Sequence, residues 1–485
     1  MNTKTFSYMT LFLLVIAHAG CGPAQEEHSP QPSETMAQTV TPGVAAIAMP
    51  DRYAAQISQD ILQAGGNAVD AAIAAGFSLA VTFIDAGNIG GGGFMTIKMA
   101  DEVAFLDYRE KAPMAAHRDM YLDPEGNVIE NITLIGGQAA GVPGTVAGFW
   151  QAHQRFGSMP WKDLILPAIR LAEDGFIPAP ALVDDIHSVN NWFGDQTNFN
   201  RYFAAIQHDR IFQQAELADT LKRIAVLGAD DFYRGETANL IVTQMNKANG
   251  LISIDDLNNY QAVWRQPLRV KWREYEVISA PPPSSGGFAV IQLLKMKDHL
   301  VHLFKDIEHN SAQYIHLVAE MEKRVFADRA EYLGDPDFVD IDVSALIAED
   351  YINSRAEQVS ATTISELKGV NPGLESPNTT HYSIVDAQGN AVSNTYTINW
   401  SYGSGVVVEG AGFLLNNEMD DFSAKPGVPN IFGVVGDQAN EIQPGKRMLS
   451  SMSPTILLKD GGVEMVLGTP GGSTIFTSVF QVIVN

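Results

Sequence analysis

The sequence predicts an α+β protein, because helical and strand patterns occupy different parts of the 485-residue chain. Helical patterns dominate residues 140 to 260, whereas strands, turns and glycines prevail after about residue 370. Hydrophobic residues make up 46% and charged residues 18% of the chain, which is ordinary for a globular protein. We expect about two to four domains, or one large body of helices and strands.

The net charge is strongly negative, at −25 with histidine neutral. Because no surplus of lysine and arginine exists to neutralise phosphates, nucleic acid is not expected as a partner. The charge favours solubility and self-repulsion. Any arginine that binds an anionic ligand must therefore do so through its own local contacts, because the overall charge of the protein repels anions.

Residues 1–20 are predicted to be an export signal. Lys4 precedes the apolar run YMTLFLLVIA, which is too short to span a bilayer as a helix. Two processing sites compete: AHA, ending at residue 19, fits ordinary signal cleavage, and AGC, ending at Cys21, resembles the box of a bacterial lipoprotein. Cys21 is the only cysteine, which favours lipidation, although His18 fits that box poorly. We expect export to the periplasm or cell envelope, with a lipid anchor as the favoured alternative.

The next segment, residues 21–42, is polar and contains prolines, so it is expected to form a flexible tether. The folded part is expected to start near Gly43. No internal repeat and no second long apolar segment follow in the sequence.

Each further element has its own local signals. Asp51 is placed to cap a first helix, and Asn67 to cap a second helix whose many Ala and Gly residues indicate close packing on a sheet. Glycines 90–93 lead into a hairpin expected over residues 94–110. Their spacing differs from a dinucleotide-binding fingerprint, so close packing is the better interpretation. The amphipathic segment 311–334 predicts a long helix.

A second hairpin is predicted where HYSIV and AVSNTYTIN flank the turn sequence DAQGN. Pairing Val385 with Ala391 sets Thr379 opposite Thr397. Because side chains alternate along a strand, Thr397 and Asn399 are expected on the same face as Thr379.

A threonine can transfer acyl groups when a base lies near its hydroxyl, and a free amino terminus is such a base. The pKa of an α-amine, roughly 7.7 to 8.0, suits proton transfer near neutrality. Thr379 lies inside the chain, so its amine becomes free only if the Asn378–Thr379 bond is broken. The alternative is an ordinary strand start, since threonine favours strands.

Five further segments carry motif-like runs: LDYREKAP, APPPSSGGF, LLNNEMDDFS, KRMLSSMSPT and LGTPGGSTIF. In their order and spacing they resemble the γ-glutamyltransferase family (γ-glutamyltranspeptidase, glutathione hydrolase), and the likeness runs from about residue 43 to residue 485. The resemblance implies a four-layer αββα sandwich of the N-terminal-nucleophile hydrolase type. It also implies a precursor that cleaves itself at Asn378–Thr379 into a large subunit, residues 43–378, and a small subunit, residues 379–485, with Thr379 as the nucleophile.

A γ-glutamyl donor carries an α-carboxylate and an α-ammonium, so its site needs a cationic fork, an acidic pair and an oxyanion hole. Arg109 suits a carboxylate, and the glycine pair before a predicted helix offers backbone N–H groups for an oxyanion. Ordinary roles remain open for both: a surface ion pair with Glu110 or Asp107 for Arg109, and a structural turn for the glycines. The acidic cluster of NNEMDDFS could equally be solvated, and it lacks the calcium-binding pattern of an EF-hand.

The resemblance assigns a role to each residue. It makes Thr397 orient the nucleophile, and it assigns the oxyanion hole to Gly471 and Gly472. It assigns substrate binding to the following set: Arg109, Ser450 and Ser451 for the α-carboxylate, and Asn399, Glu418 and Asp421 for the α-amino group.

Two features depart from the family pattern. Phe432 stands in the segment KPGVPNIFGVVGDQANEIQ, which resembles a lid loop, where a tyrosine is often found. The chain stops at FQVIVN within a predicted helix, while family members continue for roughly another fifth of their length, so its C-terminal part is interpreted as truncated. His381 shares the strand face of Thr379 but is interpreted as structural. No metal-ligand spacing occurs, and neither a metal nor a cofactor is expected.

These patterns together predict a γ-glutamyl hydrolase and transferase. It is expected to act on glutathione and related γ-glutamyl compounds and to pass the acyl group to water or to amino-acid or dipeptide acceptors. One alternative is a cephalosporin or glutaryl acylase of the same superfamily, and another is an inactive exported lipoprotein that only binds small molecules. Glutaryl donors lack the α-amino group, so Glu418 and Asp421 favour γ-glutamyl substrates.

Overall fold

Two antiparallel sheets form the centre of the protein, in a computed structural model that describes residues 43–366 and 379–485. The six-stranded sheet has the order β1 (Ala46–Ala48), β7 (Thr380–Val385), β8 (Ala391–Thr397), β2 (Gly92–Met99), β3 (Glu102–Asp107) and β4 (Val263–Arg265). The four-stranded sheet has the order β10 (Gly462–Leu467), β9 (Thr455–Lys459), β6 (Tyr275–Ser279) and β5 (Leu268–Trp272).

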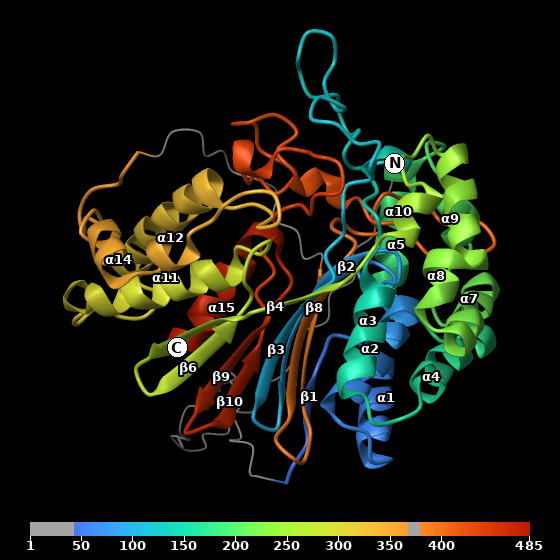
Figure 1. Ribbon diagram of the computed structural model, residues 1–485, viewed down its shortest axis with the longest axis horizontal. Helices are drawn as coiled ribbons and strands as arrows, with labels where there is room; N and C mark the ends of the chain where they lie inside the picture. Colours follow the sequence, from blue (N-terminus) through green and yellow to red (C-terminus); the bar gives the residue numbers. More distant parts are fainter. Residues whose placement is uncertain (1–42, 367–378) are drawn as a thin grey trace, which may run out of the picture. The chain divides into compact units, whose positions relative to one another are not determined.

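Helices cover the outer face of each sheet (Figure 1). The helices that share one apolar core with the six-stranded sheet are α1 (Arg52–Gln63), α2 (Ala68–Thr82), α3 (Thr145–Phe156), α4 (Trp161–Asp174), α5 (Pro180–Phe193), α6 (Phe199–Phe203), α7 (Ala215–Leu227), α8 (Ala229–Arg234), α9 (Glu236–Lys247) and α10 (Ile254–Asn258). The helices that share one apolar core with the other sheet are α11 (Gly286–His299), α12 (Ala312–Tyr332), α13 (Val343–Leu346), α14 (Glu349–Ala356) and α15 (Ile475–Val484). The predicted αββα sandwich is confirmed.

The first two helices begin where the sequence predicts. The Asp51 side chain accepts a hydrogen bond from the Ala54 N–H at the start of α1, and Asn67 forms a capping box with Asp70 at the start of α2. Small residues allow α2 to lie close to its neighbours: a Cβ at Gly76 would come within 2.3 Å of the Phe149 ring. The packing of this helix therefore requires the Ala- and Gly-rich sequence.

Side chains of β7 and β8 alternate between two apolar layers. Tyr382 and Tyr396 point to the helices, and their hydroxyl groups donate to backbone oxygens of α2 at 2.9 and 3.0 Å. Val385 and Ala391 face the other way and pack with Ile456 of the four-stranded sheet. Thr379 continues this second face, so it lies at the junction of the two sheets rather than in the outer core.

The predicted register of the second hairpin is confirmed, because Val385 pairs with Ala391 and Thr380 pairs with Tyr396. Strand β7 begins at Thr380, one residue before the predicted strand segment HYSIV. Thr379 itself has a φ of +116°, a conformation that costs energy for a residue with a branched side chain. The close packing expected for glycines 90–93 is also observed: a Cβ at Gly91 would lie 2.0 Å from the Thr397 carbonyl oxygen.

Some predictions fall outside the described residues. The export signal at residues 1–20, the tether at residues 21–42 with Cys21, and Asn378 before the predicted cleavage site are in this group. In the part that the structure describes, no helix is long and apolar enough to span a membrane.

Candidate active site

Thr379 and Thr397 are neighbours, as the predicted register requires. The Thr379 hydroxyl lies 3.4 Å from the Thr397 hydroxyl, and both side chains are buried. The Thr397 oxygen also accepts a hydrogen bond from the Asn399 N–H at 2.9 Å. Thr397 is thus fixed by the loop that follows β8, and it can hold the Thr379 hydroxyl in one orientation.

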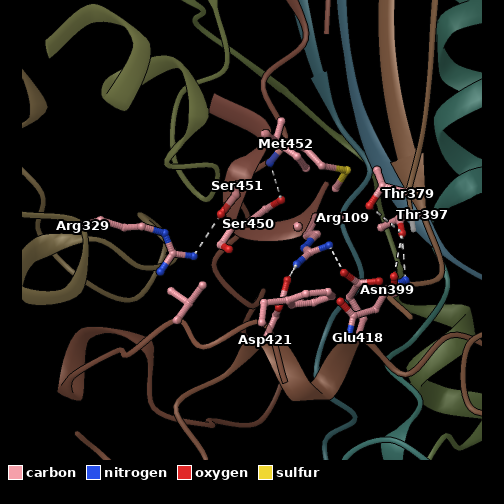
Figure 2. A pocket seen from close by; sticks show the side chains of 15 residues that line it. Arg109, Arg329, Thr379, Thr397, Asn399, Glu418, Asp421, Ser450, Ser451 and Met452 are labelled. Atoms are coloured by element: carbon pink, nitrogen blue, oxygen red, sulfur yellow. Dashed lines mark hydrogen bonds and ion pairs between the residues drawn. The ribbon is translucent and has the colours of Figure 1, made fainter. Parts of the chain in front are cut away.

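A single pocket contains most of the predicted site residues (Figure 2). Its lining residues come from the ends of several elements that meet beside Thr379. Those that the sequence predicted are Arg109, Thr379, Thr397, Asn399, Glu418, Asp421, Ser450, Ser451 and Gly472. Gly471, the remaining predicted residue of this group, does not line the pocket and precedes Gly472 in the chain.

Arg109 follows strand β3 and is completely buried. One of its terminal nitrogens donates to Glu418 and the other to Asp421, while its Nε donates to the Met448 carbonyl at 3.3 Å. Burial disfavours the charge, but Glu418 and Asp421 outweigh this effect and raise the pKa of Arg109. The guanidinium is therefore a permanent cation. It is buried and not at the surface, and Glu110 is a third, more distant carboxylate partner at 3.8 Å.

Glu418 and Asp421 lie on the short helix η3 (Glu418–Asp421), which places both carboxylates beside the pocket. Burial raises the pKa of both groups, and the nearby Arg109 opposes that shift. They are therefore not a solvated acidic loop. Asn399 completes this side of the pocket, where its side-chain N–H donates to the Asn417 carbonyl at 3.0 Å.

Ser450 and Ser451 precede strand β9 and face the same pocket. The backbone of Ser450 is held on both sides, because its N–H donates to Pro283 at 2.9 Å and its carbonyl accepts from Ser285 at 2.8 Å. The Ser451 hydroxyl accepts a hydrogen bond from Arg329 at 3.4 Å. Both serines can donate to an anion that lies near Arg109.

Gly471 and Gly472 form the turn that leads through a short helix into α15. Their φ values of +133° and +52° lie in the left-handed region, which favours glycine. Neither N–H donates to an acceptor within residues 43–366 and 379–485. These free N–H groups are available to an oxyanion, and Gly472 is the one that lines the pocket.

The predicted lid segment covers one side of the pocket. The Asn430 side chain donates to Asp421 at 3.1 Å, and the Phe432 ring lies 5.8 Å from the Trp400 ring. A Cβ at Gly472 would come 2.6 Å from the Phe432 ring, so this ring packs directly on the glycine turn. The aromatic wall is present without the hydroxyl group that a tyrosine would add.

His381 is partly buried and makes polar contacts with one side chain of its own strand and one of β8. Its Nδ1 lies 2.8 Å from the Thr395 hydroxyl and its Nε2 lies 2.9 Å from the Ser383 hydroxyl. Burial lowers the pKa of His381 to about 3, so the ring is neutral. Both nitrogens are occupied away from Thr379, which supports the structural interpretation of His381.

Two further charged residues belong to the site: Arg329, which the sequence did not indicate, and Glu110, which it offered only as an ion-pair partner of Arg109. Arg329 of α12 lines the pocket, and buried Glu110 has an oxygen 3.8 Å from the Arg109 guanidinium. Arg329 lies four residues after buried Val325 and eight after buried Met321, so it sits on the apolar stripe of its helix. A charged residue at such a position is a signal that could have revealed it.

Replacing Glu110 with glutamine tests the charge state of this buried group. Burial raises the pKa of Glu110 to about 7, although Arg109 opposes the shift, whereas an unfolded chain has a value of about 4.3. The extra proton affinity stabilises the folded state below the unfolded pKa, and this contribution is lost as the pH rises through about 7. Relative to Glu110→Gln, the free energy of unfolding of the unmodified protein should fall from pH 5 to pH 8, by up to about 1.4 kcal/mol per pH unit. Urea denaturation at several pH values measures this difference, and a difference that does not change with pH would contradict it.

Within the described residues, no group of three or more His, Cys, Asp or Glu side chains is arranged to hold a metal ion. The site has the parts for acyl transfer instead: a hydroxyl group, a permanent cation, two carboxylates and free backbone N–H groups. This set fits a zwitterionic acyl donor.

Comparisons with known proteins found a matching family profile and similar curated proteins. Residues 54–485 match the family profile described as Gamma-glutamyltranspeptidase. The chain is 57% identical to a glutathione hydrolase proenzyme of Pseudomonas aeruginosa, in a match that covers 93% of this chain and 81% of the relative.

Two solved structures share the fold. One is a gamma-glutamyltranspeptidase from Pseudomonas nitroreducens complexed with L-DON, with a TM-score of 0.66 and 51% identity over 67% of this chain and 97% of that chain. The other is a cephalosporin acylase from Bacillus halodurans, with a TM-score of 0.79 and 26% identity over 95% of this chain and 83% of that chain.

Proposed function

Because this chain belongs to the gamma-glutamyltranspeptidase family and is therefore a γ-glutamyl hydrolase and transferase, we propose that Thr379 is its nucleophile. The observation that supports this role is the contact of the Thr379 hydroxyl with Thr397 in a pocket that also contains Arg109, Glu418 and Asp421. Glutathione is the proposed physiological donor, and other γ-glutamyl amides share its recognised part.

The donor's head group has complementary partners in the pocket. We assign its α-ammonium to Glu418 and Asp421 with help from Asn399, and its α-carboxylate to the side of Arg109 with Ser450 and Ser451. Both carboxylates already contact the Arg109 guanidinium, so the three charged groups are held in place before a donor arrives. This acidic pair favours γ-glutamyl over glutaryl donors, which lack an ammonium group.

The proposed reaction has two acyl-transfer steps. The free α-amine of Thr379 takes the proton of its own hydroxyl, and the oxygen attacks the γ-carbonyl carbon. The tetrahedral oxyanion is stabilised by the N–H groups of Gly471 and Gly472. The leaving amine then takes the proton, and a γ-glutamyl ester forms on Thr379. Water or an acceptor amine attacks this ester, and the threonine hydroxyl is restored.

The α-amine must first be produced from the precursor. We propose that the Thr379 hydroxyl attacks the Asn378 carbonyl carbon, that the ester formed in this shift is hydrolysed, and that a large subunit ending at Asn378 and a small subunit starting at Thr379 result. The φ of +116° at Thr379 supports this step, because a strained residue gains when its preceding peptide bond is broken.

We further propose that residues 1–20 direct export to the periplasm or cell envelope, and that Cys21 is either lipidated or left in the tether. The acceptors are proposed to be amino acids or dipeptides. Amino-terminal sequencing of both subunits tests the processing sites in one experiment.

Donor assays test the catalytic proposal. The enzyme should hydrolyse a γ-glutamyl anilide much faster than the matching glutaryl anilide, and an amino-acid acceptor should yield the transfer product. Faster hydrolysis of the glutaryl anilide would favour the acylase alternative. A chain that stays uncut and inactive would favour the alternative of a binding lipoprotein.

A further inference from the structure

Arg329 is a buried cation without a carboxylate partner. It is 5% exposed, and no Asp or Glu oxygen lies within 4.0 Å of its guanidinium in the described part of the chain. Its Nε donates to the Ser285 hydroxyl at 3.0 Å and one terminal nitrogen donates to the Ser451 hydroxyl at 3.4 Å. Two of about five N–H groups are thus occupied, and the guanidinium lines the pocket that contains Thr379.

Other buried arginines of this protein are paired differently. Arg324, on the same helix, contacts a carboxylate oxygen of Glu320 at 3.0 Å, and Arg109 contacts two carboxylates. A buried charge without a partner is costly, so it persists where an anion binds or where structure demands it. Burial lowers the pKa of Arg329 to about 10, so the group still carries its charge near neutral pH.

The charges of the side chains that line the pocket suggest a role for Arg329. The charged side chains that line it are Arg109, Arg329, Glu418 and Asp421. When Glu418 and Asp421 are both ionised, they carry two negative charges against the one positive charge of Arg109, so these three groups alone would repel a donor carboxylate. Arg329 makes the lining neutral, which matches a donor head group with one positive and one negative charge.

The position of Arg329 fits the carboxylate side of that head group. Figure 2 shows Arg329 and Thr379 at opposite ends of the pocket, with Ser450 and Ser451 between them. Arg329 reaches Ser451 directly, and its other partner Ser285 donates to the Ser450 carbonyl at 2.7 Å. One side chain thus supports both serines that we assign to the α-carboxylate.

We propose that Arg329 is the second cation of the α-carboxylate subsite and makes the enzyme selective for acyl donors with a carboxylate at the α position. This inference rests on the proposed γ-glutamyl transferase function. Arg329 acts on the donor by its charge and by fixing the Ser451 hydroxyl, so it is a positioning and selectivity residue and leaves the chemistry at Thr379 unchanged.

The test compares two 4-nitroanilide donors with the same leaving group. The γ-glutamyl donor has both head-group charges, and the 4-aminobutyryl donor has the ammonium without the carboxylate. Arg329→Gln should lower kcat/KM for the γ-glutamyl donor about 10- to 100-fold, mainly through KM, and should change kcat/KM for the 4-aminobutyryl donor less than about threefold. Inhibition by L-glutamate and by 4-aminobutyrate gives the same comparison for ligands that do not react.

Controls separate this role from a structural one. Arg329→Lys keeps the charge and should retain part of the selectivity, and it replaces Arg329→Gln in the comparison if the latter chain stays uncut. Arg324→Gln removes a buried arginine of the same helix outside the pocket and should leave the ratio of the two donors unchanged. Equal losses for both donors, or no loss for either, would overturn the proposal. An unmodified enzyme that cleaves no γ-glutamyl donor would instead refute the proposed function.

Discussion

Thr379→Ala is expected to remain one uncut polypeptide and to lose γ-glutamyl hydrolysis and transfer by at least about 10⁴-fold. Both losses have the same cause, because the hydroxyl that attacks the donor is also the one that we propose attacks the Asn378 carbonyl. A denaturing gel shows the processing state, and release of 4-nitroaniline from γ-glutamyl-4-nitroanilide measures the activity.

The adjacent threonine provides the matched control. Thr380 is buried on β7, and its hydroxyl has no hydrogen-bond partner within residues 43–366 and 379–485. Thr380→Val keeps the shape of the side chain and removes only this hydroxyl, so the variant should be processed and active. A split, active Thr379→Ala variant would refute the role of Thr379. An uncut Thr380→Val variant would indicate that the Thr380 hydroxyl, and not that of Thr379, is the nucleophile.

Arg109→Leu is expected to have the second largest effect. It leaves Glu418 and Asp421 buried without their cation, which should lower the free energy of unfolding by about 3–5 kcal/mol. Arg109 opposes the rise in the pKa of both carboxyls, so removing it raises their folded-state pKa further. Bound protons therefore stabilise the variant more than the unmodified protein, and this extra stabilisation is lost as the pH rises. The loss of stability should therefore be larger at pH 8 than at pH 5, as measured by urea denaturation.

Arg109→Lys separates binding from folding. It keeps a cation beside Glu418 and Asp421 but loses the two-pronged geometry of the guanidinium. We expect a smaller loss of stability and a kcat/KM for γ-glutamyl-4-nitroanilide about 100-fold below that of the unmodified enzyme. A folded, processed Arg109→Lys variant with an unchanged KM would contradict the assignment of Arg109 to the donor head group.

Local patterns in the sequence predicted the elements that set the geometry of the nucleophile. The caps at Asp51 and Asn67 depend on neighbouring residues only, and the register of β7 and β8 follows from one short turn. The contact of Thr379 with Thr397 was predicted for the same reason. The roles of Ser450, Ser451 and the glycine pair came from the family resemblance, and these roles stay proposals.

The electrostatics of the pocket could not be predicted in this way. Arg109 and Glu418 are 309 residues apart in the chain, and Arg329 and Ser451 are 122 residues apart. Such contacts depend on how α12, η3 and the loop before β9 meet, which no local pattern specifies. Burial of Glu110 behind Arg109 has the same origin, and it changes the protonation of a residue that the sequence shows as one more acidic side chain.

The order of the strands has a consequence for the two halves of the processed enzyme. β7 and β8 lie between β1 and β2 of the other half, and β9 is hydrogen-bonded to β6. After the scission that we propose before Thr379, the two polypeptides remain interleaved within both sheets, and separating them means breaking three ladders of backbone hydrogen bonds. Native molecules should therefore not exchange their large or small subunits with one another. Two inactive variants with lesions in opposite halves should fail to complement each other when mixed, unless both are first unfolded and then refolded together.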